Sequence, residues 1–204
     1  MINYPRLAFF TSKTGSNLKA IVSSCDSGSL KAKPVIVISN NQNSEALIWA
    51  KSHGLHNIFL NVEKAGSQKS LDNLHLKILQ AHKIDFVILA GYLEKIGKGL
   101  LSFYKNRIIN IHPSLLPKYG GKGMYGIKIH QKVISSGDKV TGITVHLANE
   151  DYDKGVIIAQ KKIKVSNYDT PLTLSTKVLE EEHFFYSQTL RKIFSGEIDL
   201  LSLG

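Results

Sequence analysis

Short apolar runs alternate with segments of helical periodicity over the first ninety residues of the chain. Continuous apolar, β-branched runs are typical of strands buried on both faces, whereas apolar positions three and four residues apart predict amphipathic helices. The predicted strands are 7–10, 34–39, 58–60 and 86–90. The predicted helices begin near Leu18, after Ser44 and near Leu71. Strand–helix alternation of this kind predicts an α/β fold with a parallel, Rossmann-like sheet and helices on both faces.

The second half of the chain continues the pattern with less regular spacing. A fifth strand is predicted at 107–112, followed by a loop rich in Gly and Pro and a short helix that ends near Ser136. Two further strands, 140–148 and 156–165, precede a long closing helix at 171–194. With no internal repeat and no linker-like segment, we expect one domain over residues 1–204 and a mostly parallel sheet of about seven strands.

Composition narrows the class of protein further. The chain holds 26 Lys and Arg against 16 Asp and Glu, a formal charge of +10, which suits anionic partners such as phosphorylated metabolites or nucleic acid. The basic residues are scattered, however, which is equally typical of a lysine-rich surface. No run reaches the length of a membrane span, and Met1–Arg6 does not resemble a signal peptide, so we expect a cytoplasmic protein. A single cysteine, Cys25, excludes an internal disulfide and a thiolate metal site.

Gly15-Ser16-Asn17 follows the first predicted strand and opens the first helix. Ligands of parallel α/β sheets bind beyond the carboxyl ends of the strands, and a helix N-terminus there can hold a phosphate with its free backbone N–H groups. The motif matches neither the Walker pattern nor the dinucleotide fingerprint. An ordinary turn with Ser16 or Asn17 as the N-cap remains the alternative.

Asn110 and His112 lie two residues apart on the fifth strand, so their side chains share one face while Ile109 and Ile111 point the other way. An amide beside an imidazole can stabilise an oxyanion and move a proton. A hydrogen-bonded pair that ends the strand is the alternative reading of the same residues.

The run Asn110-Ile111-His112-Pro113-Ser114-Leu115-Leu116-Pro117 resembles the signature of the folate-dependent formyltransferases. The segments 141–146 and Asp153-Lys154-Gly155 are similar to that family's second signature, and Gly15-Ser16-Asn17-Leu18 resembles the branch that formylates glycinamide ribonucleotide. The resemblance runs from about Leu7 to the last helix. Related branches carry further domains for which 204 residues leave no room.

The resemblance implies a reaction and a set of site residues. The co-substrate is 10-formyltetrahydrofolate, the acceptor is the amine of glycinamide ribonucleotide in purine synthesis, and no metal is needed. Asn110, protonated His112 and Asp153 match the catalytic positions, and Asp153 is expected to raise the pKa of His112. Thr144 and His146 are expected to support them. The implied substrate-binding residues are Gly15, Ser16, Asn17, Pro113 and Glu182, and the implied folate-binding residues are Leu89, Gly91, Leu93, Glu94, Lys95, Ile96, Ala148 and Glu150.

The chain departs from the family pattern at three positions. Glu94 stands where an arginine is expected near the folate, and Lys95 could replace it. Gln68 stands where an arginine is expected near the phosphate, and Lys69 lies beside it. Lys154 replaces a glycine. The glycine-rich loop 119–126 is a candidate flap or simply a divergent loop. We expect His130, which follows it, to be a surface helix residue, and Glu182 also reads as part of the solvated face Glu180-Glu181-Glu182.

Alternatives remain open at this point. A hydrolase would release formate from the same folate, and a related transferase would formylate an amino-sugar nucleotide. A basic, non-catalytic nucleic-acid-binding module fits the charge but lacks an aromatic-studded basic stripe. We expect small-molecule partners, neither nucleic acid nor membrane, and a monomer or homodimer.

Overall fold

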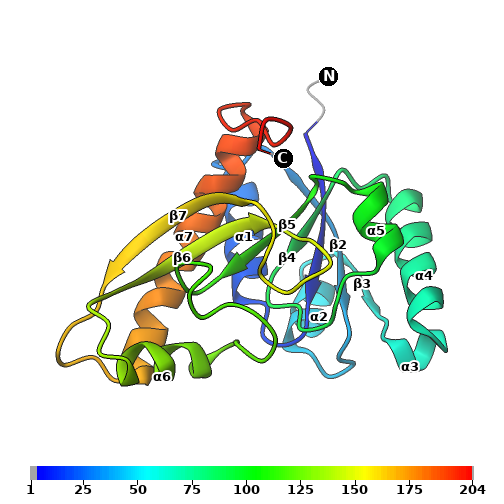
Figure 1. The fold of residues 1–204 in the computed structure, drawn as a ribbon. Coiled ribbons are helices and arrows are strands. Elements are labelled where there is room, and N and C mark those ends of the chain that lie inside the picture. Colours follow the sequence, from blue (N-terminus) through cyan, green and yellow to red (C-terminus); the bar gives the residue numbers. More distant parts are fainter. Residues whose placement is uncertain (1–3, 204) are drawn as a thin grey trace.

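The structure, a computed structural model, describes residues 4–203. Met1, Ile2 and Asn3, which belong to the segment judged not to resemble a signal peptide, lie outside the described residues. A seven-stranded sheet runs through the middle of the protein in the order β3-β2-β1-β4-β5-β6-β7 (Figure 1). The strands β3 to β5 in this order are parallel, whereas β6 is antiparallel to both of its neighbours. The bounds are β1 (Arg6–Thr11), β2 (Lys33–Ser39), β3 (His56–Phe59), β4 (Phe86–Leu89), β5 (Ile108–His112), β6 (Val140–Leu147) and β7 (Ile157–Lys164).

Helices cover both faces of the sheet (Figure 1). Their bounds are α1 (Ser16–Asp26), α2 (Glu45–Ser52), α3 (Val62–Ala65), α4 (Gln68–Ala81), α5 (Lys98–Phe103), α6 (Ile127–Ser135) and α7 (Pro171–Phe194). Side chains alternate between the two cores along β1: Leu7 and Phe9 pack with α1, α2, α6 and α7, whereas Ala8 and Phe10 pack with α4 and α5. Because the central strands are buried on both faces, they read as unbroken apolar runs. The predicted fold class is confirmed.

Two short helices, α3 and α5, escaped the sequence prediction. Helix α5 has six residues, and a helix of that length is not stable by itself. The carboxylate of Asp72, from α4, accepts hydrogen bonds from Gly99 N (2.8 Å) and Leu100 N (3.0 Å) and so satisfies its first turn. The cap comes from a side chain 27 residues away, which no local pattern reveals.

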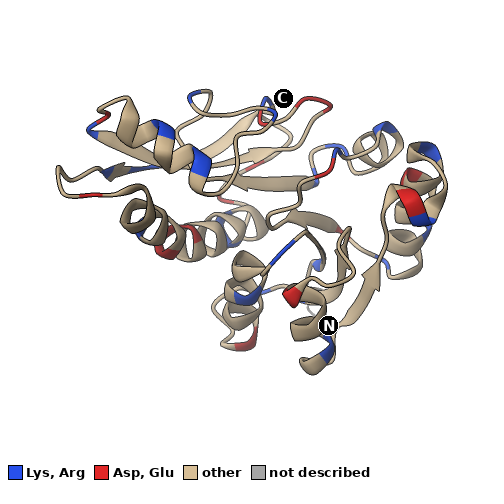
Figure 2. Cartoon of the chain, turned by 90° about the horizontal axis from the view of Figure 1, so that it is seen from below, with Lys and Arg blue, Asp and Glu red and all other residues tan. Residues whose placement is uncertain are grey.

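Lys and Arg are spread over many helices and loops, with Asp and Glu among them, in the view of Figure 2. None of the helices within residues 4–203 combines the length and the apolar character that a membrane crossing requires. In the view of Figure 2, the basic residues behind the +10 net charge are scattered and form no single basic stripe.

The strand order places the site. The chain runs outward from β1 to β2 and β3 on one side, and from β4 to β5 on the other. The connections that leave the carboxyl ends of β1 and β4 therefore go to opposite sides, which opens a crevice at this edge of the sheet. Asn110 and His112 end β5, directly beside that crevice.

Candidate active site

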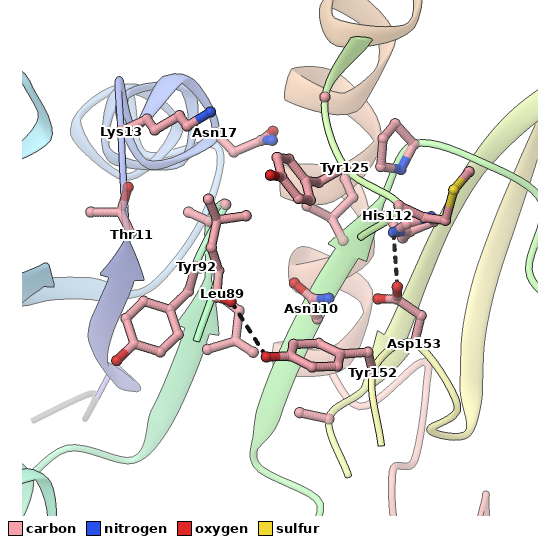
Figure 3. Close-up of a pocket in the computed structure, with 18 of the residues that line it drawn as sticks. Thr11, Lys13, Asn17, Leu89, Tyr92, Asn110, His112, Tyr125, Tyr152 and Asp153 are labelled. Carbon is pink, nitrogen blue, oxygen red and sulfur yellow. Dashed lines mark hydrogen bonds and ion pairs between the residues drawn. The ribbon is translucent and has the colours of Figure 1, made fainter. Parts of the chain in front are cut away.

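A cavity of about 610 Å³ opens at this edge of the sheet (Figure 3). Its walls come from the β1–α1 loop, the segment after β4, the end of β5, the glycine-rich loop and one face of α7. Every predicted site residue except Thr144 lines it: Gly15, Ser16, Asn17, Leu89, Gly91, Leu93, Glu94, Lys95, Ile96, Asn110, His112, Pro113, His146, Ala148, Glu150, Asp153 and Glu182. The structure thus brings distant segments together, while the role of each residue stays a prediction.

The first turn of α1 faces this cavity with its backbone N–H groups uncovered. Gly15 is the N-cap, with φ of +66° and no side-chain capping hydrogen bond, so the alternative reading of Ser16 or Asn17 as the N-cap is wrong. A Cβ on Gly15 would come within 2.7 Å of the Ala46 Cβ, so glycine is required here both for its backbone angle and for the close approach of α2. N–H groups left free at a helix N-terminus suit an anionic group such as phosphate.

Asn17 and Glu182 meet at the inner end of this turn. Asn17 Nδ2 donates to Glu182 Oε2 at 3.1 Å, and both residues are buried. Burial raises the pKa of Glu182 to about 7, against the opposing effect of the Asn17 hydrogen bond. The solvated-face reading of Glu182 is wrong, because Glu182 is buried on the inward face of α7, whereas Glu180 is exposed and Glu181 is only partly buried. Asn17 Oδ1 has no partner within the described part of the chain and remains free to accept from a ligand hydroxyl.

His112 lies between two groups from different loops. Its Nε2 donates to the Tyr119 carbonyl at 2.8 Å, so Nε2 carries the proton in the neutral ring and Nδ1 is the nitrogen left to exchange one. Asp153 Oδ2 is 3.5 Å from Nδ1 (Figure 3). Tyr119 and Asp153 both have φ of +58°, a left-handed conformation that is uncommon outside glycine. Such backbone strain is concentrated at functional sites.

The charge state of His112 differs from the sequence-based expectation. Burial lowers the pKa of His112, and the opposing effects of Asp153 and the Tyr119 carbonyl do not compensate for it. The expectation of a raised pKa and a cationic ring is therefore wrong for the protein without ligands, because burial of the ring outweighs the neighbouring carboxylate. Burial also raises the pKa of Asp153, but His146, the charge of His112 and the Gly121 N–H outweigh it, so the pKa of Asp153 lies below its usual value.

Asn110 is held by a histidine on the neighbouring strand. Asn110 and His146 are paired across β5 and β6, and Asn110 Nδ2 lies 3.1 Å from His146 Nε2. His146 Nδ1 lies 2.9 Å from the Leu147 carbonyl and donates to it, which leaves Nε2 facing Asn110 and, at 3.7 Å, Asp153 Oδ1. The amide orientation follows from this network. It leaves the second Nδ2 hydrogen of Asn110 for a ligand in the cavity.

Thr144 lies outside the cavity and holds its wall. The buried hydroxyl donates to the Ser114 carbonyl at 2.7 Å and accepts from Leu116 N at 3.0 Å and Gln160 Nε2 at 2.9 Å. One side chain on β6 thereby fixes the loop that follows His112.

The predicted folate segment is tied to the β1 loop. Ser12 Oγ accepts from Leu93 N at 2.9 Å, and Ser12 N donates to the Gly91 carbonyl at 3.2 Å. Tyr92 OH and Glu94 Oε2 are buried and have no partner among residues 4–203. Lys95 Nζ lies 5.5 Å from the centre of the Tyr152 ring.

The three departures from the family pattern differ in their position. Glu94 lines the cavity, whereas Gln68 begins α4 and is not among the lining residues. Lys154 is exposed and pairs with Asp151 at 3.4 Å. The next residue, Gly155, is the constrained one, because a Cβ there would lie 1.6 Å from the Leu147 carbonyl oxygen.

Some cavity residues were missed or misplaced by the sequence analysis. His130 is buried and lines the cavity, so the surface-residue expectation is wrong, and burial lowers the pKa of His130 to about 4. The spacing Ile129, His130, Val133 marks the inward face of α6 and could have revealed it. Residues not singled out include Thr11, Lys13, Met124, Tyr125 and Tyr152. Within residues 4–203, no group of three or more His, Cys, Asp or Glu side chains is arranged to hold a metal ion.

Taken together, the fold and the site define an α/β enzyme whose cavity, at the switch point of the sheet, combines an anion-binding helix end with a histidine–carboxylate pair. The chain belongs to the formyl transferase family, whose model matches residues 5–190.

Relatives within this family support the assignment. The chain is 39% identical over 194 residues to the chloroplastic phosphoribosylglycinamide formyltransferase of Arabidopsis thaliana, covering 95% of this chain and 66% of that protein. It is 31% identical to the phosphoribosylglycinamide formyltransferase of Haemophilus influenzae, covering 96% and 90%. The chain thus spans slightly less than two thirds of the plant relatives, at 66% and 62%, and most of the bacterial one.

Solved structures agree with the family assignment. Glycinamide ribonucleotide transformylase 1 from Symbiobacterium toebii matches with a TM-score of 0.88 at 32% identity, covering 96% of this chain and 90% of that one. The phosphoribosylglycinamide formyltransferase of Bacillus halodurans matches with a TM-score of 0.86 at 35% identity, covering 93% and 95%.

Proposed function

We propose that this protein transfers the formyl group of 10-formyltetrahydrofolate to the amine of glycinamide ribonucleotide. The observation that carries the proposal is the joint presence, in one cavity, of the Gly15–Asn17 helix end and the Asn110, His112 and Asp153 cluster. The first suits a sugar phosphate and the second suits an acyl transfer. The names of the relatives, phosphoribosylglycinamide formyltransferases, support the same acceptor and the transfer of a formyl group.

The chemistry needs no covalent intermediate on the protein, because an unprotonated amine is already a nucleophile. The amine nitrogen bonds to the formyl carbon and gives a tetrahedral species with negative charge on the former carbonyl oxygen. Asn110 donates its second Nδ2 hydrogen to that oxygen, and His146 keeps the amide oriented for this. Stabilising an oxyanion with a pre-positioned donor is worth about 3–4 kcal/mol of barrier.

His112 moves the proton that the attack releases. Because its pKa is lowered, the ring is neutral at pH 7 and accepts the proton of the attacking nitrogen at Nδ1. Asp153, 3.5 Å away, stabilises the resulting imidazolium. His112 then returns the proton to the folate nitrogen as the carbon–nitrogen bond to it breaks. The formylated ribonucleotide and tetrahydrofolate are the products.

The polar groups at the two ends of the cavity fit two different ligands. Asn17 Oδ1 and the Glu182 carboxylate are acceptors beside the phosphate cradle and suit ribose hydroxyls. Tyr92 and Glu94, at the other end, suit the N–H groups of a pterin ring, and Leu89, Leu93 and Ile96 supply apolar walls. The arginine expected from the family pattern would donate hydrogen bonds to the folate, whereas in this proposal the Glu94 carboxylate accepts them.

The test is to follow folate and product together, with and without glycinamide ribonucleotide. We expect loss of the formyl group to depend on the ribonucleotide and to yield formylated product in equal amount. Equal formate release with and without the ribonucleotide would favour the hydrolase instead. A higher kcat/KM for an amino-sugar nucleotide than for glycinamide ribonucleotide would favour the sugar-nucleotide formyltransferase.

Five further expectations accompany this proposal. We take the protein to act on small molecules in the cytoplasm, as a single domain over residues 1–204 and as a monomer or homodimer, with no resident metal. A nucleic-acid-binding role predicts affinity that falls steeply with salt, so a DNA titration at two salt concentrations tests it directly.

A further inference from the structure

Cations are few in the cavity. Lys13, Lys95 and Lys122 line it, and no arginine does so among the described residues. Lys95 lies at the opposite end, over the ring of Tyr152, and Lys122 belongs to the glycine-rich loop. Lys13 lies two residues before Gly15, at the entrance of α1. The cradle for an anion therefore has one lysine beside it on its own loop.

The backbone of Lys13 is fixed by the start of α2. Its carbonyl oxygen accepts from Ser44 Oγ at 3.0 Å and from Ala46 N at 3.2 Å. The Gly15 approach to Ala46 packs the same two segments together. The origin of the Lys13 side chain is thus held rigidly relative to the first turn of α1.

The ammonium group of Lys13 is held by an aromatic ring rather than by a carboxylate. Lys13 Nζ lies 5.6 Å from the centre of the Tyr125 ring, and Lys128 Nζ lies 5.0 Å from the same centre. No carboxylate lies within 4.0 Å of Lys13 Nζ in the described part of the chain. Figure 3 shows Lys13 extended towards Asn17, with Tyr125 facing both across the cavity. A cation–π contact orients the lysine without neutralising its charge.

Two further observations point to an anionic ligand with sugar hydroxyls at this end. The first turn of the eleven-residue α1 has no acidic residue and no side-chain cap. Asn17 is 8% exposed, and its Oδ1 is buried, unpartnered and directed into the cavity. The nearby Glu182 carboxylate would repel a phosphate once ionised, so the site needs a cation to offset it.

We propose that Lys13 is the cationic contact of the substrate phosphate and that Tyr125 positions it. The inference rests on the proposed function and adds to it a specificity-determining residue and a task for the glycine-rich loop. Tyr125 lies between positive-φ glycines at 123 and 126, so this loop carries the ring to the Lys13 side of the cavity. Through Tyr125 the loop therefore contributes to ribonucleotide binding.

The first experiment compares Lys13→Met with Lys13→Arg, and uses Lys95→Met as the matched control. Lys95 is also a lysine over a tyrosine ring but lies at the other end of the cavity. We expect Lys13→Met to raise the KM for glycinamide ribonucleotide roughly tenfold or more and Lys13→Arg to recover most of it, with the folate KM unchanged. The control should leave the ribonucleotide KM unchanged. An unaltered ribonucleotide KM in Lys13→Met would overturn the proposal.

The ring is tested by Tyr125→Phe against Tyr125→Ala. Phenylalanine keeps the aromatic face and should behave like the parent protein, whereas alanine should raise the ribonucleotide KM with little change in kcat. A fall of kcat at constant KM in Tyr125→Ala would instead place the ring at the reacting atoms and contradict its positioning role.

Calorimetry with ribose 5-phosphate and with ribose separates this inference from the proposed reaction. We expect ribose 5-phosphate to bind the parent protein, to bind Lys13→Met at least about tenfold more weakly, and ribose to be insensitive to the change. Lys13-dependent binding in a protein that does not formylate glycinamide ribonucleotide would leave the inference standing and remove the function. Formyl transfer with Lys13-independent binding would do the reverse.

Discussion

Asn17 and Glu182 are 165 residues apart in the chain, yet the amide of Asn17 donates to the Glu182 carboxylate at 3.1 Å. The bond joins the first turn of α1 to the inward face of α7. Since α1 and α7 pack against one another over the same face of the sheet, the proposed ribonucleotide end of the cavity is built on two packed helices.

This relationship predicts a pH-dependent stability. Glu182 has a pKa of about 7 in the folded protein and an ordinary value near 4.5 when unfolded. The folded state therefore favours the protonated acid, and this contribution is complete below pH 4.5 and lost as pH rises towards 7 and above. Its size is about 3 kcal/mol by linkage. Thermal unfolding of Glu182→Gln and of the parent protein between pH 4.5 and 8 measures it. The parent should lose more stability than the variant across this range, and parallel curves would contradict the prediction.

The pair His112 and Asp153 predicts the acidic limb of the pH–rate profile. In the proposed reaction His112 acts as a base, and because its pKa is lowered, the acidic limb of kcat/KM should lie below the ordinary histidine value of 6.5. Asp153 opposes that lowering, so Asp153→Asn should move the limb to still lower pH as well as reduce the rate. Asp151→Asn is the control, because Asp151 is exposed and pairs with Lys154. If the acidic limb stays at the same pH in Asp153→Asn, Asp153 does not influence the pKa of His112.

Asn110 is predicted to act on the transition state rather than on binding. Asn110→Ala should lower kcat by at least about a hundredfold while both KM values change little, because the lost donor faces only the developing oxyanion. His146→Gln tests its support: a smaller fall is expected, since His146 orients the amide and is not the group that donates to the oxyanion in the proposed reaction. Near-normal kcat in Asn110→Ala would remove the amide from the mechanism.

The sheet could be predicted because its central strands are unbroken apolar runs, and their order placed the ends of β1, β4 and β5 together. The position of Glu182 also had a signal that was not used. Leu174, Val178 and Tyr186 are buried at four-residue intervals on α7, and residue 182 falls on the same stripe. A glutamate in a buried stripe points to function more strongly than a glutamate in an acidic run.

Other features depend on contacts that no local pattern contains. The lowered pKa of His112 arises because the ring is buried beneath segments from elsewhere in the chain, which a count of neighbouring charges cannot show. The four glycines of the loop 119–126 indicate an irregular segment without showing which cavity wall the Tyr125 ring reaches. Helix α5 owes its first turn to Asp72, a side chain from another helix.

The last prediction concerns Thr144, whose hydroxyl holds the loop after His112 in place. Thr144→Val keeps the shape of the side chain but leaves the Leu116 N–H, the Ser114 carbonyl and Gln160 without their buried partner. We expect a loss of about 2–3 kcal/mol in the free energy of unfolding, since unsatisfied buried polar groups carry a desolvation penalty. Thr176→Val, at an exposed position of α7 where the hydroxyl bonds only to its own helix, should cost less than about 1 kcal/mol. Because Thr144 holds the loop after His112, its variant should also lose kcat under conditions where it is fully folded. Denaturant titration and turnover of the two variants measure both effects, and equal stability losses would show that the hydroxyl network does not hold this loop.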